Sequence, residues 1–228
     1  MHILDYSSPN YDSRDGAQVD MLVLHYTGMQ TGQEALTRLC DPAAKVSAHY
    51  LVEEDGRVFR LIQESKRAWH ARVASWGGKR NINARSIGIE IVNPGHEFGY
   101  RPFTEAQMQS LVVLCREILA RYKIPAHHIV AHSDVAPVRK QDPGELFDWE
   151  RLAEQGIGLF PPESLMTFEK AYNRDDLAAY GYSCQDASDE QLVTAFQRHF
   201  RPGQVNGIWD HDCAARLQWL LEKISHSV

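Results

Sequence analysis

The sequence predicts an α/β protein in which helices pack on a central mixed β-sheet, followed by a small C-terminal domain of three helices. Short apolar runs with strand character alternate with amphipathic helical segments over roughly the first 160 residues. A segment rich in Gly and Pro, residues 156–162, interrupts this pattern, and only helical periodicity follows it. We therefore expect two domains, residues 1–163 and residues 164–228.

Five short runs in the first domain have the composition and periodicity of β-strands. They are residues 20–26, 47–52, 57–62, 86–92 and 129–131. The Asp55-Gly56 pair between the second and third runs predicts a β-hairpin. In the fourth run three isoleucines alternate with Gly88 and Glu90, so the Glu90 side chain is expected on the face opposite the isoleucines.

The clearest helix is residues 104–122, where apolar side chains recur at intervals of three and four. Thr104 and Gln107 have the spacing of a capping box, and Phe103 and Met108 that of a hydrophobic staple across it. Further helices are expected at residues 32–40, directly after Asp148, and at 173–180, 188–200 and 210–224.

The composition is that of an ordinary globular protein, with 43% hydrophobic and 24% charged residues among 228. The net charge of −6 argues against a nucleic acid or an anionic membrane as partner, and no apolar run reaches the roughly 20 residues that span a bilayer. The first residues lack a basic stretch followed by an apolar one, so no signal peptide is expected. The absence of a CxxC pair excludes a thiolate zinc knuckle, while the spacing of Cys184 and Cys213 leaves open whether they form a disulfide.

Two of the predicted strands end in histidine. His25 and His132 each follow an apolar run, and Asp142 lies ten residues after His132 in a loop containing Pro and Gly. Strands that end at one sheet edge would bring these side chains together. Two imidazoles and one carboxylate leave a fourth position for water, which is the open geometry of a catalytic zinc site. Such a zinc lowers the pKa of its water from 15.7 toward about 7, so hydroxide could attack a carbonyl at neutral pH.

Hydrolysis also needs a proton acceptor and a cation for the oxyanion. Glu90, on the face away from the isoleucines, could accept the proton of the water. Lys140, two residues before Asp142, could stabilise the negative charge that develops on the carbonyl oxygen. Spacing alone leaves the alternative that these are an ordinary strand glutamate and a loop lysine.

Six segments, in this order along residues 20–160, resemble the zinc-dependent N-acetylmuramoyl-L-alanine amidases of the type 2 family, which are related to peptidoglycan recognition proteins. The segments are LVLHYTG (22–28), SAHYLV (47–52), RAWHA (67–71), SIGIEIVN (86–93), IVAHSDVAP (129–137) and RKQDPG (139–144). The resemblance implies one Zn²⁺ held by His25, His132 and Asp142, with Glu90 as the acid–base residue and Lys140 as the oxyanion stabiliser. It also implies hydrolysis of the amide between N-acetylmuramic acid, or its 1,6-anhydro form, and L-alanine of the stem peptide.

The C-terminal domain resembles a three-helix peptidoglycan-binding module over residues 195–221, with its Phe-Gln pair, Asn-Gly turn and Leu-rich last helix. The alternative is a helical cap that stabilises the first domain. The combination resembles cell-envelope amidases of Gram-negative bacteria, so we expect the periplasm or cell envelope as location, with the cytoplasm as alternative. Peptidoglycan or muropeptides would be the partners, and the oligomeric state stays open.

Residues 65–89 contain six basic residues and no acid, which suits a ligand that carries carboxylates. Within and near this stretch we expect substrate contacts from Tyr26, His70, Trp76 and Asn83, whereas Trp69 is expected in the core.

Two alternative interpretations of the sequence are a zinc helix of the HExxH type and a non-catalytic binding protein. The segment from His96 to Tyr100 starts like an HExxH zinc helix but has no second histidine. A non-catalytic peptidoglycan-binding or sensing protein on the same fold usually lacks a ligand or the acid–base residue, and here all five positions are present.

Overall fold

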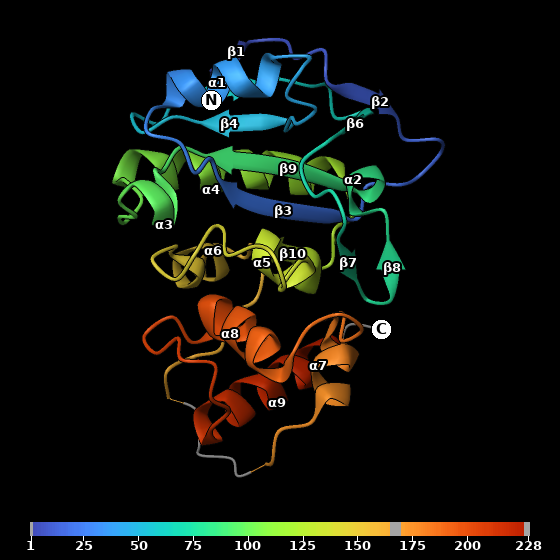
Figure 1. Cartoon of the computed structure of the whole chain (residues 1–228), viewed down its shortest axis with the longest axis vertical. Coiled ribbons are helices and arrows are strands. Elements are labelled where there is room, and N and C mark those ends of the chain that lie inside the picture. The colour runs from blue at the N-terminus through green and yellow to red at the C-terminus, as the bar shows by residue number, and fades with distance from the viewer. Residues whose placement is uncertain (1, 165–169, 226–228) are drawn as a thin grey trace.

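A six-stranded mixed sheet forms the centre of the N-terminal part in the computed structural model, which describes residues 2–164 and 170–225 (Figure 1). From edge to edge its strands are β1 (Ile3–Asp5), β5 (Val58–Arg60), β4 (Tyr50–Val52), β9 (Ser86–Ile91), β3 (Met21–Tyr26) and β10 (Ile129–Ala131). The predicted hairpin is confirmed, because β4 and β5 are antiparallel, while β4, β9, β3 and β10 run parallel.

Five short strands were not predicted from the sequence, namely β1 at the sheet edge, which pairs with β5, and four strands outside the central sheet. Strand β2 (Tyr11–Ser13) pairs with β6 (Lys66–Ala68), and β7 (Ser75–Trp76) pairs with β8 (Lys79–Arg80). Two or three residues give too little alternation to be recognised as a strand from sequence.

One face of the sheet packs on the long helix α4 (Glu105–Arg121). Ile87, Ile89 and Ile91 point to this helix, and Cys115 of α4 is buried there. The predicted capping box is confirmed, since the Thr104 side chain accepts from the Gln107 amide and the Gln107 side chain accepts from the Thr104 amide. Gly88 and Glu90, alternating with the isoleucines, therefore face the other side of the sheet.

Two separate hydrophobic cores lie on that other side of the sheet. Helix α1 (Gly32–Cys40) packs over β4 and β5. Met21 and Val23 of β3 and Val130 of β10 belong to one hydrophobic core with Phe196 and other residues of the three C-terminal helices. These helices are α7 (Arg174–Tyr180), α8 (Asp189–Phe200) and α9 (His211–Ser225), and Figure 1 shows them in orange and red beside the short helices of the N-terminal part.

Four further helices complete the described chain, namely α2 (Ile82–Arg85), α3 (Gly95–Phe98), α5 (His132–Val135) and α6 (Trp149–Glu154). Asp148 caps α6 through the Arg151 amide, as predicted. Cys184 and Cys213 are free thiols in this structure, so the disulfide that the spacing left open is not formed. None of the described helices is both long and apolar enough to cross a membrane.

Candidate active site

The parallel strands at the sheet centre bring the predicted residues together. His25 of β3 and Glu90 of β9 are register partners on adjacent parallel strands, so their side chains leave the same face. Strand β10 lies on the other side of β3, and His132 is the first residue after it, at the start of α5. All three side chains thus reach one pocket, which residues of α1 also line.

His25, His132 and Asp142 form a compact buried triangle. His25 Nδ1 lies 2.9 Å from His132 Nδ1, and each of these nitrogens lies 3.0 Å from Asp142 Oδ2. Among the described residues this is the group of His, Cys, Asp and Glu side chains whose ligand atoms converge closely enough to hold a metal ion.

The electrostatics of the triangle favour the protonation states that a metal requires. Burial, with the neighbouring His132, lowers the pKa of His25 to about 4, so its imidazole is neutral near neutral pH. Burial opposes ionisation of Asp142, but the two imidazoles outweigh it and hold the pKa of this carboxyl far below its usual range. A neutral imidazole and an ionised carboxylate are the ligand forms that bind cations.

The ring of His25 is also held from behind. Its Nε2 lies 3.0 Å from Nδ1 of His70, and Nε2 of His70 lies 3.1 Å from Ser86 Oγ, which donates to the Ile82 carbonyl at 2.7 Å. If His25 uses Nδ1 as a ligand, its Nε2–H donates to His70 and every later member of the chain has a consistent proton position.

A pocket of about 200 Å³ opens on this triangle, and both Glu90 and Lys140 line it. Glu90 has some access through the pocket, yet its Oε2 is buried without a hydrogen-bond partner among the described residues. Burial and the Asp142 charge raise the pKa of Glu90 well above its usual value, and Lys140 acts in the opposite direction. The five residues singled out from the sequence therefore share one site.

Of the four predicted substrate contacts, two line the pocket and two do not. Tyr26 and His70 line the pocket, although His70 is only 7% exposed. Asn83 does not line it: this buried side chain accepts from the amides of His70 and Ala71 at 3.2 and 2.7 Å, and so fixes the loop that carries His70.

The prediction that Trp76 contacts the substrate is wrong, because Trp76 does not line the pocket. It is 1% exposed and packs edge-on against Tyr180 and Tyr182 of the C-terminal part, with ring centroids 5.7 and 5.0 Å away. Trp69, expected in the core, instead lines the pocket. Both indoles lie in one basic stretch, and only the strand β7 and its packing on the C-terminal helices distinguish them.

Two arginines line the pocket that were not named as substrate contacts, although Arg72 belongs to the basic stretch of residues 65–89 that suits a ligand with carboxylates. Arg38 of α1 and Arg72 line the pocket, and neither guanidinium has a hydrogen-bond or ion-pair partner among the described residues. Arg38 could have been found from helical spacing, because it lies three residues after Ala35, which also lines the pocket. Arg72 has φ of 49°, which no sequence pattern predicts.

Comparison with known proteins agrees with this geometry. The family model described as N-acetylmuramoyl-L-alanine amidase matches residues 15–145. N-acetylmuramoyl-L-alanine amidase AmiD of Escherichia coli is 36% identical over 97% of this chain and 91% of its own length. The 1,6-anhydro-N-acetylmuramyl-L-alanine amidase AmpD of Haemophilus influenzae is 36% identical over 63% of this chain and 86% of its own.

A solved structure of E. coli AmiD, in complex with anhydro-N-acetylmuramic acid-L-Ala-D-γ-Glu-L-Lys, superposes with a TM-score of 0.82 at 34% identity. The match covers 94% of this chain and 98% of that one, so it includes the C-terminal helices, whereas the match to AmpD is shorter. Together with the site geometry, these matches identify the chain as a member of the N-acetylmuramoyl-L-alanine amidase family, an enzyme that hydrolyses the amide between N-acetylmuramic acid and the L-alanine of the stem peptide.

Proposed function

We propose that this amidase uses one zinc ion, held by His25, His132 and Asp142, and that it accepts muropeptides with 1,6-anhydro-muramic ends as well as ordinary ones. The observation that carries the proposal is the meeting of three ligand atoms within 3.0 Å of one another in a pocket that Glu90 and Lys140 also line. The substrates named for AmiD and AmpD support the anhydro form.

The donor set fits zinc. Imidazole nitrogen and carboxylate oxygen are both zinc ligands, and three protein ligands are the usual number at a catalytic site. The hydrogen bond from His25 Nε2 to His70 is the outer-shell contact that fixes a ligating histidine in one tautomer. When bound, zinc supplies Lewis acidity that polarises a carbonyl and brings the pKa of water near 7.

Glu90 would move the proton. Its unpartnered Oε2 can take a proton from the attacking water and return it to the amine nitrogen of L-alanine as the carbon–nitrogen bond breaks. A raised pKa suits both halves of this cycle, because the carboxylate is a stronger base than a surface glutamate and its acid form persists long enough to donate.

The other pocket residues would bind and orient the substrate. Lys140 would balance the charge that develops on the lactyl carbonyl oxygen. Trp69 offers an apolar surface for the sugar ring. The guanidinium groups of Arg38 and Arg72, which have no partner within the described part of the chain, offer fork-shaped donors for the carboxylates of the stem peptide.

We retain the C-terminal residues 164–228 as a peptidoglycan-binding-like domain, and the periplasm or envelope as the location that suits a polymeric substrate. None of the described C-terminal residues lines the catalytic pocket, so polymer binding there would use another surface. Ile208, 65% exposed, is a suitable probe. Ile208→Asp should reduce co-sedimentation with purified sacculi and leave turnover of a soluble muropeptide unchanged; equal sedimentation would contradict this role.

The central test measures zinc content and peptide release on the same preparations. Anhydro-N-acetylmuramyl tripeptide and its ordinary muramic counterpart are incubated with the protein, and the products are identified by mass spectrometry. A chelator should abolish release, and added zinc should restore it. Glu90→Gln should keep one zinc per chain and lose about 10²- to 10⁴-fold in turnover, whereas Asp142→Ala should lose the metal. Release of peptide by the Glu90→Gln protein at the wild-type rate would refute the proposed role.

A further inference from the structure

A second buried cluster joins the C-terminal helices to the catalytic part. Its centre is Asp134 of α5, which is 0% exposed. Asp134 Oδ1 accepts from the hydroxyl of Tyr182 at 2.7 Å, and Oδ2 accepts from His199 Nδ1 at 2.6 Å. Tyr182 follows α7 and His199 lies on α8, so both donors come from the C-terminal domain. Oδ2 also accepts from the amide of Ala131 at 2.7 Å.

This carboxylate organises the turn that carries the proposed metal ligands. Ala131, whose amide it binds, directly precedes His132. Ser133, directly after His132, donates its amide to the carbonyl of Asp142 at 3.0 Å. Two of the three ligands are therefore tied to the first turn of α5, and Asp134 fixes that turn.

We propose that Tyr182 and His199 are positioning residues for the amidase site: by holding Asp134, they make the C-terminal domain the support for the turn that presents His132 and Asp142. The proposal rests on the proposed metal site. It gives the C-terminal domain a part in catalysis that does not depend on wall binding.

The support is rigid because His199 cannot easily move. Its ring lies between Trp149 of α6 and Phe200, with centroids 3.7 and 3.8 Å away and nearly parallel planes. Trp149 belongs to the catalytic part, so His199 is held from both sides of the domain boundary.

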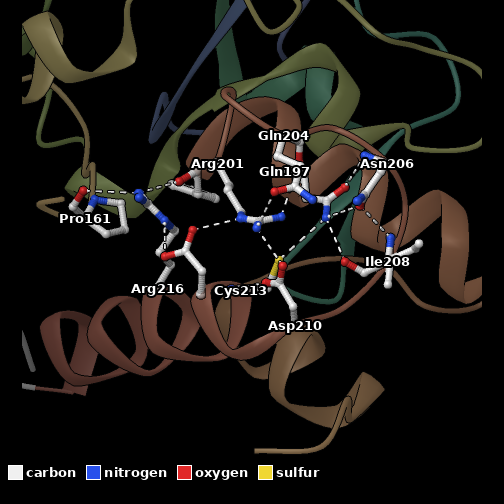
Figure 2. A network of polar contacts seen from close by, with 11 residues as sticks. Pro161, Gln197, Arg201, Gln204, Asn206, Ile208, Asp210, Cys213 and Arg216 are labelled. Carbon is white, nitrogen blue, oxygen red and sulfur yellow. Dashed lines mark hydrogen bonds and ion pairs between the residues drawn. The ribbon is translucent and has the colours of Figure 1, made fainter. Parts of the chain in front are cut away.

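The last turn of α8 is fixed further by the polar network in Figure 2. The side-chain amide of Gln197 accepts from the amides of Asn206 and Gly207 at 2.9 and 2.8 Å and donates to the Ile208 carbonyl at 2.9 Å. Arg216 of α9 donates to the Phe200 carbonyl at 2.8 Å and to Asp212 Oδ1, near the start of α9, at 3.0 Å. Figure 2 also shows its bond to the Pro161 carbonyl. The end of α8 is thus tied to the following loop and to α9.

The chemistry of the cluster makes the coupling strong. A buried carboxylate that loses one hydrogen-bond donor is left with an unsatisfied polar atom, and the protein must shift or admit water to satisfy it. Asp134 Oδ2 accepts from the Ala131 amide, which belongs to the turn that carries His132, so a shift of the carboxylate moves the turn. Loss of a group that hydrogen-bonds a metal ligand directly typically weakens metal binding 10- to 100-fold, and for these contacts, which act through the turn, we expect the lower end, about tenfold.

The test compares two phenylalanine substitutions in the full chain. Tyr180 and Tyr182 are both buried against Trp76, but only Tyr182 hydrogen-bonds Asp134 in the described structure. Tyr182→Phe should weaken zinc binding about tenfold, measured by competition with a chromophoric chelator. Tyr180→Phe, the matched control, should not change it. The visible absorption of the Co²⁺-loaded protein should shift in the first variant and not in the second.

A second pair separates the donor from the ring. His199→Asn keeps an N–H near the position of Nδ1 but leaves a cavity, so it should lower the free energy of unfolding and retain zinc affinity within about threefold. His199→Phe keeps the stacked ring and removes the donor, so it should lose zinc affinity about tenfold or more. The proposal is overturned if the variant of this pair with the lower free energy of unfolding also has the lower zinc affinity. It is likewise overturned if Tyr182→Phe binds zinc as tightly as the wild type.

Amide hydrogen exchange of residues 131–136 in the metal-free protein makes the result independent of zinc. Exchange there should be about tenfold faster in Tyr182→Phe and His199→Phe than in Tyr180→Phe. A wild-type protein that bound no zinc would contradict the proposed function, while this exchange difference would still decide the positioning role. Equal exchange in the three variants would refute it.

Discussion

Substitution of Gly88 by alanine tests whether His70 holds the proposed metal ligand His25 in place. Gly88 lies on β9 on the same face as Glu90, directly under the His70 ring. A Cβ at this position would lie 2.5 Å from His70 Cγ and 2.7 Å from His70 Nδ1. The backbone of Gly88 has no positive φ, so any penalty comes from the close approach alone.

The magnitude follows from how firmly His70 is held. The contact is about 0.9 Å closer than the 3.4 Å at which ordinary van der Waals contact begins. His70 is hydrogen-bonded to His25 and Ser86, and Asn83 fixes its backbone, so the ring has little room to yield. Overpacking of this kind costs about 1–3 kcal/mol of stability. Displacement of Nδ1 from His25 should in addition weaken zinc binding 10- to 100-fold, which is about 1.4–2.8 kcal/mol.

The assay is a double-mutant cycle with zinc competition and chemical denaturation as readouts. His70→Ala removes the ring that the new methyl group meets, so Gly88→Ala should cost little stability in that background. For zinc affinity the two changes should not add, because both break the same contact to His25. Gly203→Ala, where a Cβ would meet nothing within 4 Å, is the control. An equal stability cost in both backgrounds, or wild-type zinc affinity in Gly88→Ala, would refute the reasoning.

Three further predictions concern the pocket and its surroundings. Arg72→Gly should raise KM for a carboxylate-bearing muropeptide about fivefold, which corresponds to about 1 kcal/mol for an exposed pair. The same change should stabilise the protein by about 1 kcal/mol, because φ of 49° suits glycine. A higher KM together with a lower free energy of unfolding would contradict this. Trp69→Ala should raise KM with little loss of stability, whereas Trp76→Ala should lower the free energy of unfolding by about 3–5 kcal/mol. A large loss of stability in Trp69→Ala, with only a raised KM in Trp76→Ala, would refute the assigned positions. Burial, with the nearby Arg14 charge, lowers the pKa of His49 to about 3. As the pH decreases below the unfolded pKa of about 6.5, the unfolded chain therefore binds a proton that the folded protein does not. The free energy of unfolding decreases as a result, by about 2 kcal/mol at pH 5 from this group. His49→Gln should flatten that part of the pH–stability curve, measured by urea unfolding, and an unchanged slope would exclude His49 as its source.

Local patterns carried most of the element prediction. Capping boxes begin with Thr104 and Ser188, and each marks a helix start that the sequence placed within a residue. These signals are local because each depends on a hydrogen bond between residues three apart. The strands β1, β2 and β6 depend instead on partners distant in sequence, and these strands, like β7 and β8, have only two or three residues and carry no periodicity of their own.

The position of each tryptophan in the basic stretch was not a local property. Trp69 and Trp76 have similar neighbours in sequence, yet Trp69 lines the pocket and Trp76 fills the boundary with the C-terminal helices. Which indole is buried depends on Tyr180 and Tyr182, more than 100 residues further along the chain. The same holds for His70, whose contact with His25 exists only because β9 brings Gly88 beneath its ring.

The residues proposed to carry the chemistry could be predicted from the sequence: two histidines at strand ends, an aspartate in the following loop, and a glutamate on the free face of a strand. This was possible because parallel strands align their ends, which makes residues distant in sequence meet at one edge. The contacts that support these residues became visible only in the folded structure. His70 behind His25, and Tyr182 with His199 behind Asp134, are contacts across 45, 48 and 65 residues. Such contacts depend on how whole elements pack, and packing is not encoded in the spacing of a motif.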